Sequence, residues 1–191
     1  RDWLDFNMFQ SGHRRYDQDN TEHNYGEDNW KHVTNTFDLK PIRPIFDGEP
    51  SYEGIPQGLH DPTQPYWEDK DVRRYAYWSV FAGGCGFTYG HNAVMQMHKP
   101  NNPDPAYGVR EFWTEAIDAK GASQLNHLKN LILSKSYFER IPDQSLISEN
   151  GEPLRVANKA NKIGICNKRG KQPAKGLPNS CISFAISSCC F

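Results

Sequence analysis

The sequence lacks several features that would place it in a common functional class. No apolar stretch approaches the roughly 20 residues that a membrane-spanning helix needs. Neither a GxGxxG motif nor a P-loop is present, and no CxxC or Cys/His spacing predicts a zinc site. The net charge of −1 gives no electrostatic reason to expect a nucleic-acid partner. We therefore expect no membrane-spanning segment, no nucleic acid and no nucleotide-binding sheet.

Aromatic residues and an uneven charge are what the sequence does have. Aromatic side chains make up 13% of a chain whose mean hydropathy is −0.80, which argues against disorder. This combination suits a packed core or a surface that binds hydroxyl-rich ligands. Residues 151–191 hold seven Lys or Arg and one acidic residue, so the rest of the chain is acidic. We predict an α/β unit over residues 1–147 and an irregular tail, disordered or read in an altered frame, over residues 148–191.

Strand-like and helix-like segments alternate along the α/β unit. Apolar runs that close on polar residues predict strands, and apolar residues at helical spacing predict helices. The predicted strands cover residues 3–13, 41–50 and 85–97, and the predicted helices cover residues 29–39 and 71–84, with one or two more within 110–135. This order is typical of parallel βα units, as in a (β/α)8 barrel or an open sheet. In both folds, ligands bind at the carboxyl ends of the strands.

Three carboxylates follow the middle predicted strand in the stretch PIFDGEPSYEG. Asp47 and Glu49 are two residues apart, so their side chains share a face in a regular strand. Glu53 lies four residues farther, in the next loop. Glycoside hydrolysis usually needs two carboxyl groups across the scissile bond, and in retaining enzymes one of them is the nucleophile. The alternative is that these carboxylates only cap the loop or are solvated at the surface.

Other polar and aromatic side chains gather at the same predicted edge. His13 and His91 each end a strand-like run, where they suit hydrogen bonding to sugar hydroxyls or orienting a carboxylate, although a single such histidine is more often structural. Gln10 and Tyr89 are further candidate substrate contacts, as is Asp47. Trp67, in a long loop rich in Pro and Gly, is predicted either to stack on a sugar or to pin the loop down. The spacing of these residues predicts no metal site, and we expect no cofactor.

Four segments, LDFNMFQSGHRR, PIRPIFDGEPSYEG, RRYAYWSVFAGGCGFTYGHNAVMQM and IPDQSLI, together resemble the apiosidase-like glycoside hydrolases. The resemblance covers about Leu4 to Ile147, and its specific part is DGEPxYE combined with GxTYGHxxVxQM. It implies a partial (β/α)8 TIM barrel, of which this chain holds the last three βα units. It also implies hydrolysis of a glycosidic bond in plant cell-wall polysaccharide, with apiose-containing side chains of pectin the best-known substrate class.

The resemblance also assigns catalytic roles. In retaining barrel glycosidases the nucleophile follows strand seven, which corresponds here to PIFDGEP, so Glu49 is the first candidate and Glu53 the second. The acid/base carboxyl follows strand four, which is not in this chain. The sequence itself does not indicate a location, but the resemblance implies a periplasmic or secreted protein.

Three interpretations of function remain open at this point. The first is a fragment of a retaining glycoside hydrolase. The second is a non-catalytic carbohydrate-binding module, which keeps the aromatic loop and the polar edge but needs no pair of carboxylates. The third is an inactive remnant, because three units of a barrel leave strand edges bare. The family usually continues into a small β-sandwich, whereas the segment NGEPLRVANKANKIG starts similarly and then diverges.

Overall fold

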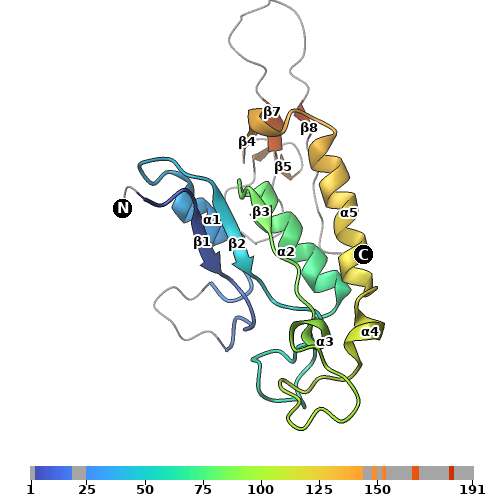
Figure 1. Ribbon diagram of the computed structural model, residues 1–191. Coiled ribbons are helices and arrows are strands. Elements are labelled where there is room, and N and C mark those ends of the chain that lie inside the picture. Colours follow the sequence, from blue (N-terminus) through green and yellow to red (C-terminus); the bar gives the residue numbers. More distant parts are fainter. Residues whose placement is uncertain are drawn as a thin grey trace, which may run out of the picture.

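The computed structural model describes residues 3–18 and 25–143, together with the backbone of four short strands farther along the chain (Figure 1). The main elements are β1 (Asn7–Gln10), α1 (Trp30–Phe37), β2 (Ile45–Glu49), α2 (Asp69–Phe81), β3 (Gly86–Phe87), α3 (Asn92–Met95), α4 (Trp113–Ala116) and α5 (Lys120–Leu133). They are followed by the 3-10 helix η1 (Tyr137–Glu139), β4 (Arg140–Pro142), β5 (Ser148–Glu149), β6 (Glu152–Pro153), β7 (Ile165–Asn167) and β8 (Cys181–Ile182).

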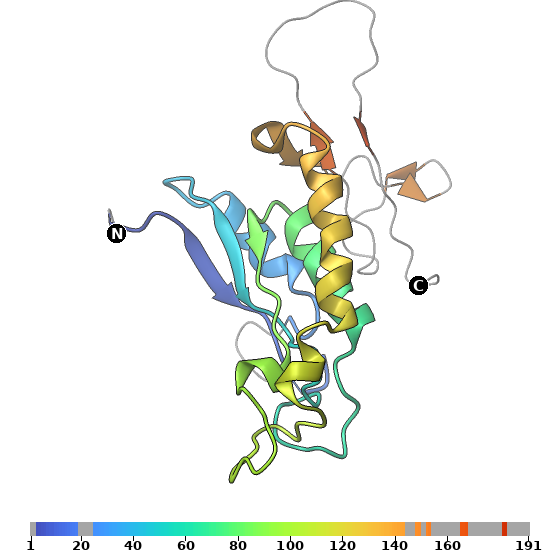
Figure 2. The same cartoon turned by 45° about the vertical axis from the view of Figure 1, so that its right-hand side comes forward.

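A small parallel sheet forms the centre of the described structure. Its strands lie in the order β1-β2-β3, and both neighbouring pairs are parallel. Figures 1 and 2 show α1 and α2 packed against the sheet, with α5 lying along α2. The alternation of strands and helices predicted from the sequence is therefore confirmed, and the three strands bring their carboxyl ends to one edge. We call this edge the carboxyl edge.

Helix α2 joins the sheet to α5. The apolar face predicted for it is confirmed, because its four members are at most 5% exposed: Val72, Tyr75, Trp78 and Phe81. Leu128 and Ile132 of α5 belong to the same core cluster as Tyr75, Trp78 and Phe81. The helix begins slightly before its predicted start, with Glu68 at the N-cap, and the side chain of Asp71 accepts a hydrogen bond from the Glu68 amide at 3.0 Å.

A β-bulge in β2 changes the directions in which the side chains of Asp47 and Glu49 point. Phe9 pairs with Asp47, but the next residue of β1, Gln10, pairs with Glu49, so Gly48 is an extra residue in β2. Because one step along β1 corresponds to two along β2, Asp47 and Glu49 face opposite sides of the sheet. The prediction that they share a face is wrong. A Cβ atom at Gly48 would lie 2.5 Å from the Met8 Sδ atom, so a glycine fits this bulge without moving Met8.

The third predicted strand is shorter than expected. Only Gly86 and Phe87 pair with β2, and residues 92–95 form the short helix α3 instead of continuing the strand. His91 is the N-cap of α3, and its Nδ1 accepts a hydrogen bond from the Ala93 amide at 3.1 Å. Side-chain capping by a histidine therefore ends the extended backbone at that point.

Beyond α5 the described strands are antiparallel. β4 pairs with β7, β7 with β8, and β5 with β6. The predicted boundary at residue 147 and most of the predicted tail lie outside the described residues. In the described part of the chain, no helix combines the length and apolar character needed to cross a bilayer.

Candidate active site

Glu49 lies at the end of β2 with its side chain 46% exposed. The side-chain amide of Gln10 donates a hydrogen bond from Nε2 to Glu49 Oε1 at 2.6 Å. The Glu49 carbonyl accepts hydrogen bonds from the amides of Ser11 and Gly12, both at 3.0 Å. The backbone and the side chain of Glu49 are thus both held by the end of β1, while part of the carboxylate remains open to solvent.

His13 lies buried beside Glu49. Its Nε2 is 3.5 Å from Glu49 Oε1, and its ring packs edge-to-face on Tyr52 with 5.0 Å between the ring centroids. Burial lowers the pKa of His13 below its ordinary value of 6.5, and the Glu49 carboxylate offsets this only in part. The ring is therefore neutral at pH 7, where it presents a polar nitrogen to Glu49 without a positive charge.

This buried imidazole predicts a specific dependence of stability on pH. In the unfolded chain His13 has its ordinary pKa of 6.5, whereas the folded-state pKa is lower. Below pH 6.5 the unfolded chain takes up the proton first, so the free energy of unfolding falls by up to about 1.4 kcal/mol per pH unit. The loss stops once the folded-state pKa is passed. Urea unfolding between pH 7.5 and 5 measures the free energy of unfolding of the wild type and of His13→Gln. The wild-type value should fall toward that of the variant as the pH falls. An equal dependence on pH in both proteins would contradict a lowered pKa of His13.

Trp67 pins the long loop of residues 54–67 rather than lining a binding surface. Its side chain is 1% exposed and packs edge-to-face on Tyr75, with ring centroids 5.7 Å apart. Its Nε1 donates a hydrogen bond to the His13 carbonyl at 3.3 Å. The prediction that Trp67 stacks on a sugar is wrong for this arrangement, because no face of the indole is accessible.

Asp47 is also buried. It is 0% exposed, and its oxygens accept hydrogen bonds from Ser79 Oγ at 2.6 Å, Ser11 Oγ at 2.9 Å and Asn29 Nδ2 at 3.1 Å. Burial raises the pKa of Asp47, and these hydrogen bonds oppose the rise. The predicted contact between Asp47 and substrate is therefore wrong. Asp47 instead joins β2 to α1, α2 and the end of β1.

Asn29 joins the same network from the start of α1. It occupies the N-cap position of α1, yet its side chain makes no capping hydrogen bond. The amide instead points inward to Asp47, to the Tyr75 carbonyl at 2.9 Å and to Ser79 Oγ at 2.7 Å. Asn29 therefore fixes α1 against α2 and the sheet.

Glu53 is held by the segment after β3 and by the start of α5. Its Oε2 accepts hydrogen bonds from the Tyr89 hydroxyl at 2.8 Å and from the Gly121 amide at 3.1 Å. Gly121 is in the first turn of α5, where a carboxylate is favoured by the unpaired amides. Burial, together with the Glu53 carboxylate, raises the pKa of Tyr89, so this hydroxyl remains a hydrogen-bond donor.

His91 pairs with a carboxylate that the sequence motifs did not indicate. His91 is 4% exposed, and its Nε2 lies 3.2 Å from Glu111 Oε1. Glu111 belongs to the irregular segment between α3 and α4, which has no periodicity from which this contact could be predicted. Its side chain is 45% exposed, close to the value for Glu49.

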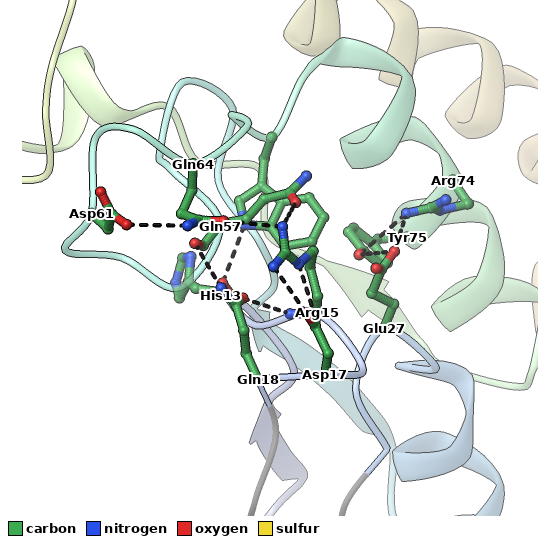
Figure 3. Close-up of polar contacts among 11 residues, drawn as sticks. His13, Arg15, Asp17, Gln18, Glu27, Gln57, Asp61, Gln64, Arg74 and Tyr75 are labelled. Carbon is green, nitrogen blue, oxygen red and sulfur yellow. Dashed lines mark hydrogen bonds and ion pairs between the residues drawn. The ribbon is translucent and has the colours of Figure 1, made fainter.

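Arg15 connects the segment after β1 to the long loop, as Figure 3 shows. Its guanidinium donates to Asp17 at 2.9 and 3.0 Å, to Gln64 at 3.2 Å and to Gln57 at 3.4 Å. These bonds engage the guanidinium within the protein, so Arg15 holds the two loops together. Figure 3 also shows a second link, in which Arg74 and Tyr75 of α2 both donate to Glu27, at 2.7 and 3.2 Å.

Gln10, His13, Glu49, Glu53, Tyr89 and His91 thus all lie near the ends of the parallel strands or in the turns that follow them. Within the described ranges, no three His, Cys, Asp or Glu side chains are placed so that they could hold a metal ion. The chemistry available in this part of the chain is that of carboxylates, amides, phenols and imidazoles.

Comparison with known proteins gives this arrangement a family context. Residues 1–139 match the family described as Apiosidase-like, catalytic domain. A crystal structure of a glycoside hydrolase family 5 protein from Bacteroides vulgatus ATCC 8482 is similar at 46% identity and a TM-score of 0.78, covering 87% of this chain and 36% of its own. A solved structure described as a glycoside hydrolase is similar at 48% identity and a TM-score of 0.73, covering 88% of this chain and 40% of its own.

These matches define how far the similarity extends. This chain spans 36% and 40% of the lengths of the two solved relatives. No match was found among curated proteins. The fold is α/β, with a small parallel sheet and helices similar to those of the glycoside hydrolase family 5 protein, and the resemblance to O-glycosyl hydrolases extends over most of the chain. The chain belongs to the apiosidase-like catalytic domain family.

Proposed function

We propose that this protein is a retaining glycoside hydrolase in which Glu49 is the nucleophile. The observation that carries the proposal is the setting of Glu49: a half-exposed carboxylate at the carboxyl end of the middle strand, 2.6 Å from the Gln10 amide and 3.5 Å from the buried His13 ring. Membership of the apiosidase-like family supports the reaction type. Glu53 ranks second because its Oε2 is already engaged by Tyr89 and Gly121.

The reaction has two steps. Glu49 attacks the anomeric carbon while a carboxylic acid protonates the departing oxygen, which gives a covalent glycosyl-enzyme. That second residue, now a carboxylate, then removes a proton from water, and the water releases the sugar with its anomeric configuration retained. The resemblance to the family assigns the acid/base carboxyl to a strand outside this chain. Gln10, His13, Tyr89 and His91 are the proposed contacts to substrate or to the reacting carboxylate.

The proposed substrate is a pectic side chain of the plant cell wall, and specifically one that contains apiose. The family description supports this choice. A partly exposed edge of carboxylates, amides and phenols also suits a ligand rich in hydroxyl groups, because each of these groups can exchange a hydrogen bond with water for one with a sugar.

We propose further that β1, β2 and β3 are three consecutive strands of a (β/α)8 barrel. Among the described residues, β1 pairs only with β2, and Met8 on β1 is 66% exposed. The small share of the solved relatives that this chain covers agrees with a partial barrel. The exposed face of β1 and its open edge are where further strands would pair.

Covalent trapping tests the retaining mechanism. An activated 2-deoxy-2-fluoro apioside should add one sugar to the protein expressed from its complete gene, because the fluorine slows both steps while the activated leaving group restores formation, so that the glycosyl-enzyme accumulates. Peptide mass spectrometry should place the sugar on Glu49, and Glu53→Gln should still be labelled. A sugar found on Glu53, or hydrolysis of the natural linkage with inversion by NMR, would reject the assignment. Sugar binding without any hydrolysis would indicate the non-catalytic module instead.

A further inference from the structure

The pair formed by His91 and Glu111 resembles the pair formed by His13 and Glu49. In each case a buried histidine that follows a strand places Nε2 near a carboxylate oxygen, at 3.5 Å for His13 and Glu49 and at 3.2 Å for His91 and Glu111. Because His91 Nδ1 accepts a hydrogen bond from the Ala93 amide, the ring proton lies on Nε2 and points to Glu111. The histidine therefore orients a carboxylate that is still 45% exposed.

The segment that carries Glu111 is fixed by the long loop 54–67. The Arg110 guanidinium carbon lies 3.8 Å from the centre of the Tyr66 ring, and the Tyr66 hydroxyl donates to the Gly108 carbonyl at 2.8 Å. On the other side, Asn92 Nδ2 donates to the Tyr107 carbonyl at 2.8 Å. An exposed side chain on an irregular segment is usually mobile, whereas here the residues before it are held by two neighbouring parts of the structure.

Tyr52 links the surroundings of Glu49 to those of Glu111. Tyr52 packs on His13, which is beside Glu49, and a Cβ atom on Gly90 would lie 2.3 Å from the Tyr52 ring. Gly90 immediately precedes His91 in the chain, so the Tyr52 ring contacts both His13 and the residue next to His91. The pKa of Tyr52 is raised by burial and by the charge of Glu49, and that of Tyr89 is raised partly by Glu111, which agrees with this placement.

We propose, on the basis of the glycoside hydrolase function above, that Glu111 is a substrate-binding residue whose carboxylate, oriented by His91, accepts hydrogen bonds from hydroxyl groups of the sugar bound beside Glu49. The long loop 54–67 then has the function of holding this residue in place. No sequence motif indicates Glu111, because the contact joins two irregular segments.

Kinetics and calorimetry of two variants test the proposal. A hydrogen bond from a sugar hydroxyl to a charged acceptor contributes enough that its loss weakens binding about 10- to 100-fold. Glu111→Ala should therefore raise KM and the calorimetric Kd for an apiose-containing pectic oligosaccharide by about that factor, with kcat within about threefold. Glu111→Gln keeps an acceptor oxygen and should show a smaller increase. Glu139→Gln changes an exposed glutamate in η1, beyond the C-terminal end of α5; it is the matched control and should change nothing.

The outcomes separate this proposal from the one on which it rests. Unchanged KM and Kd in Glu111→Ala, with the thermal unfolding of the wild type, would overturn the role of Glu111. A large loss of kcat that azide restores would also overturn it, because Glu111 would then be one of the two reacting carboxylates. If Glu111→Ala weakens sugar binding while Glu49→Gln retains full turnover, the binding role stands and only the nucleophile assignment fails.

Discussion

Glu49→Gln is expected to lower kcat by at least about a thousandfold, because an amide cannot attack the anomeric carbon and no other nucleophile takes its place. The glutamine keeps the size of the side chain and an acceptor oxygen for the Gln10 amide, which lies 2.6 Å from Glu49 Oε1. Sugar binding should therefore stay within about fivefold of the wild type. Reducing-sugar release from an apiose-containing pectic oligosaccharide, alongside calorimetry with the same ligand, measures the two effects separately.

The matched control is Glu53→Gln, which removes a second carboxylate from the same edge. The Tyr89 hydroxyl can still donate to the amide oxygen of this variant, so a loss of at most about tenfold in kcat is expected, arising from the weaker contact to α5. In Glu49→Ala, added azide should enter the vacated space and give a glycosyl azide of inverted configuration. Full turnover in Glu49→Gln combined with a thousandfold loss in Glu53→Gln would transfer the nucleophile to Glu53.

The elements with strong periodicity could be predicted from the sequence. Helix α2 repeats its apolar residues on one face, and all four members of that face are buried as expected. The order of strands and helices also follows from the pattern, because parallel strands need a crossover between them. The carboxyl edge could be located in the same way, since Gln10, Glu49 and His91 each end or closely follow an apolar run.

The directions of individual side chains could not be predicted. A regular strand places Asp47 and Glu49 on one face, and only the pairing of Gln10 with Glu49 across the bulge at Gly48 reverses one of them. The difference is large in physical terms, because it separates a carboxylate that is 0% exposed from one whose side chain is 46% exposed. Trp67 was ambiguous for a related reason: an aromatic residue in a loop packs inward or outward according to tertiary contacts that its neighbours in the sequence do not specify.

Asp47→Ala is expected to destabilise the fold by about 3–5 kcal/mol. The change removes the acceptor for three side-chain donors, from Ser11, Asn29 and Ser79, at a site from which water is excluded. These donors come from the end of β1, the start of α1 and the last turn of α2, so their loss affects all three of these elements. Urea unfolding followed by tryptophan fluorescence measures the change, and a loss of this size is a large part of the stability of an ordinary domain.

Asp47→Asn separates the hydrogen bonds of this network from its charge. Oδ2 accepts from Asn29, Ser79 and Ser11, whereas Oδ1 accepts only from Ser11, whose hydroxyl is shared between the two oxygens. An asparagine can therefore place its oxygen at the Oδ2 position and donate from its nitrogen to Ser11 Oγ, so that the polar groups remain paired. We expect a cost below about 1.5 kcal/mol for this variant, and a change within about 0.5 kcal/mol for Asp118→Ala at the surface. If Asp47→Asn costs as much as Asp47→Ala, then the negative charge, rather than the count of paired groups, holds β2 to the helices, and the ionised carboxylate must be the form that folds.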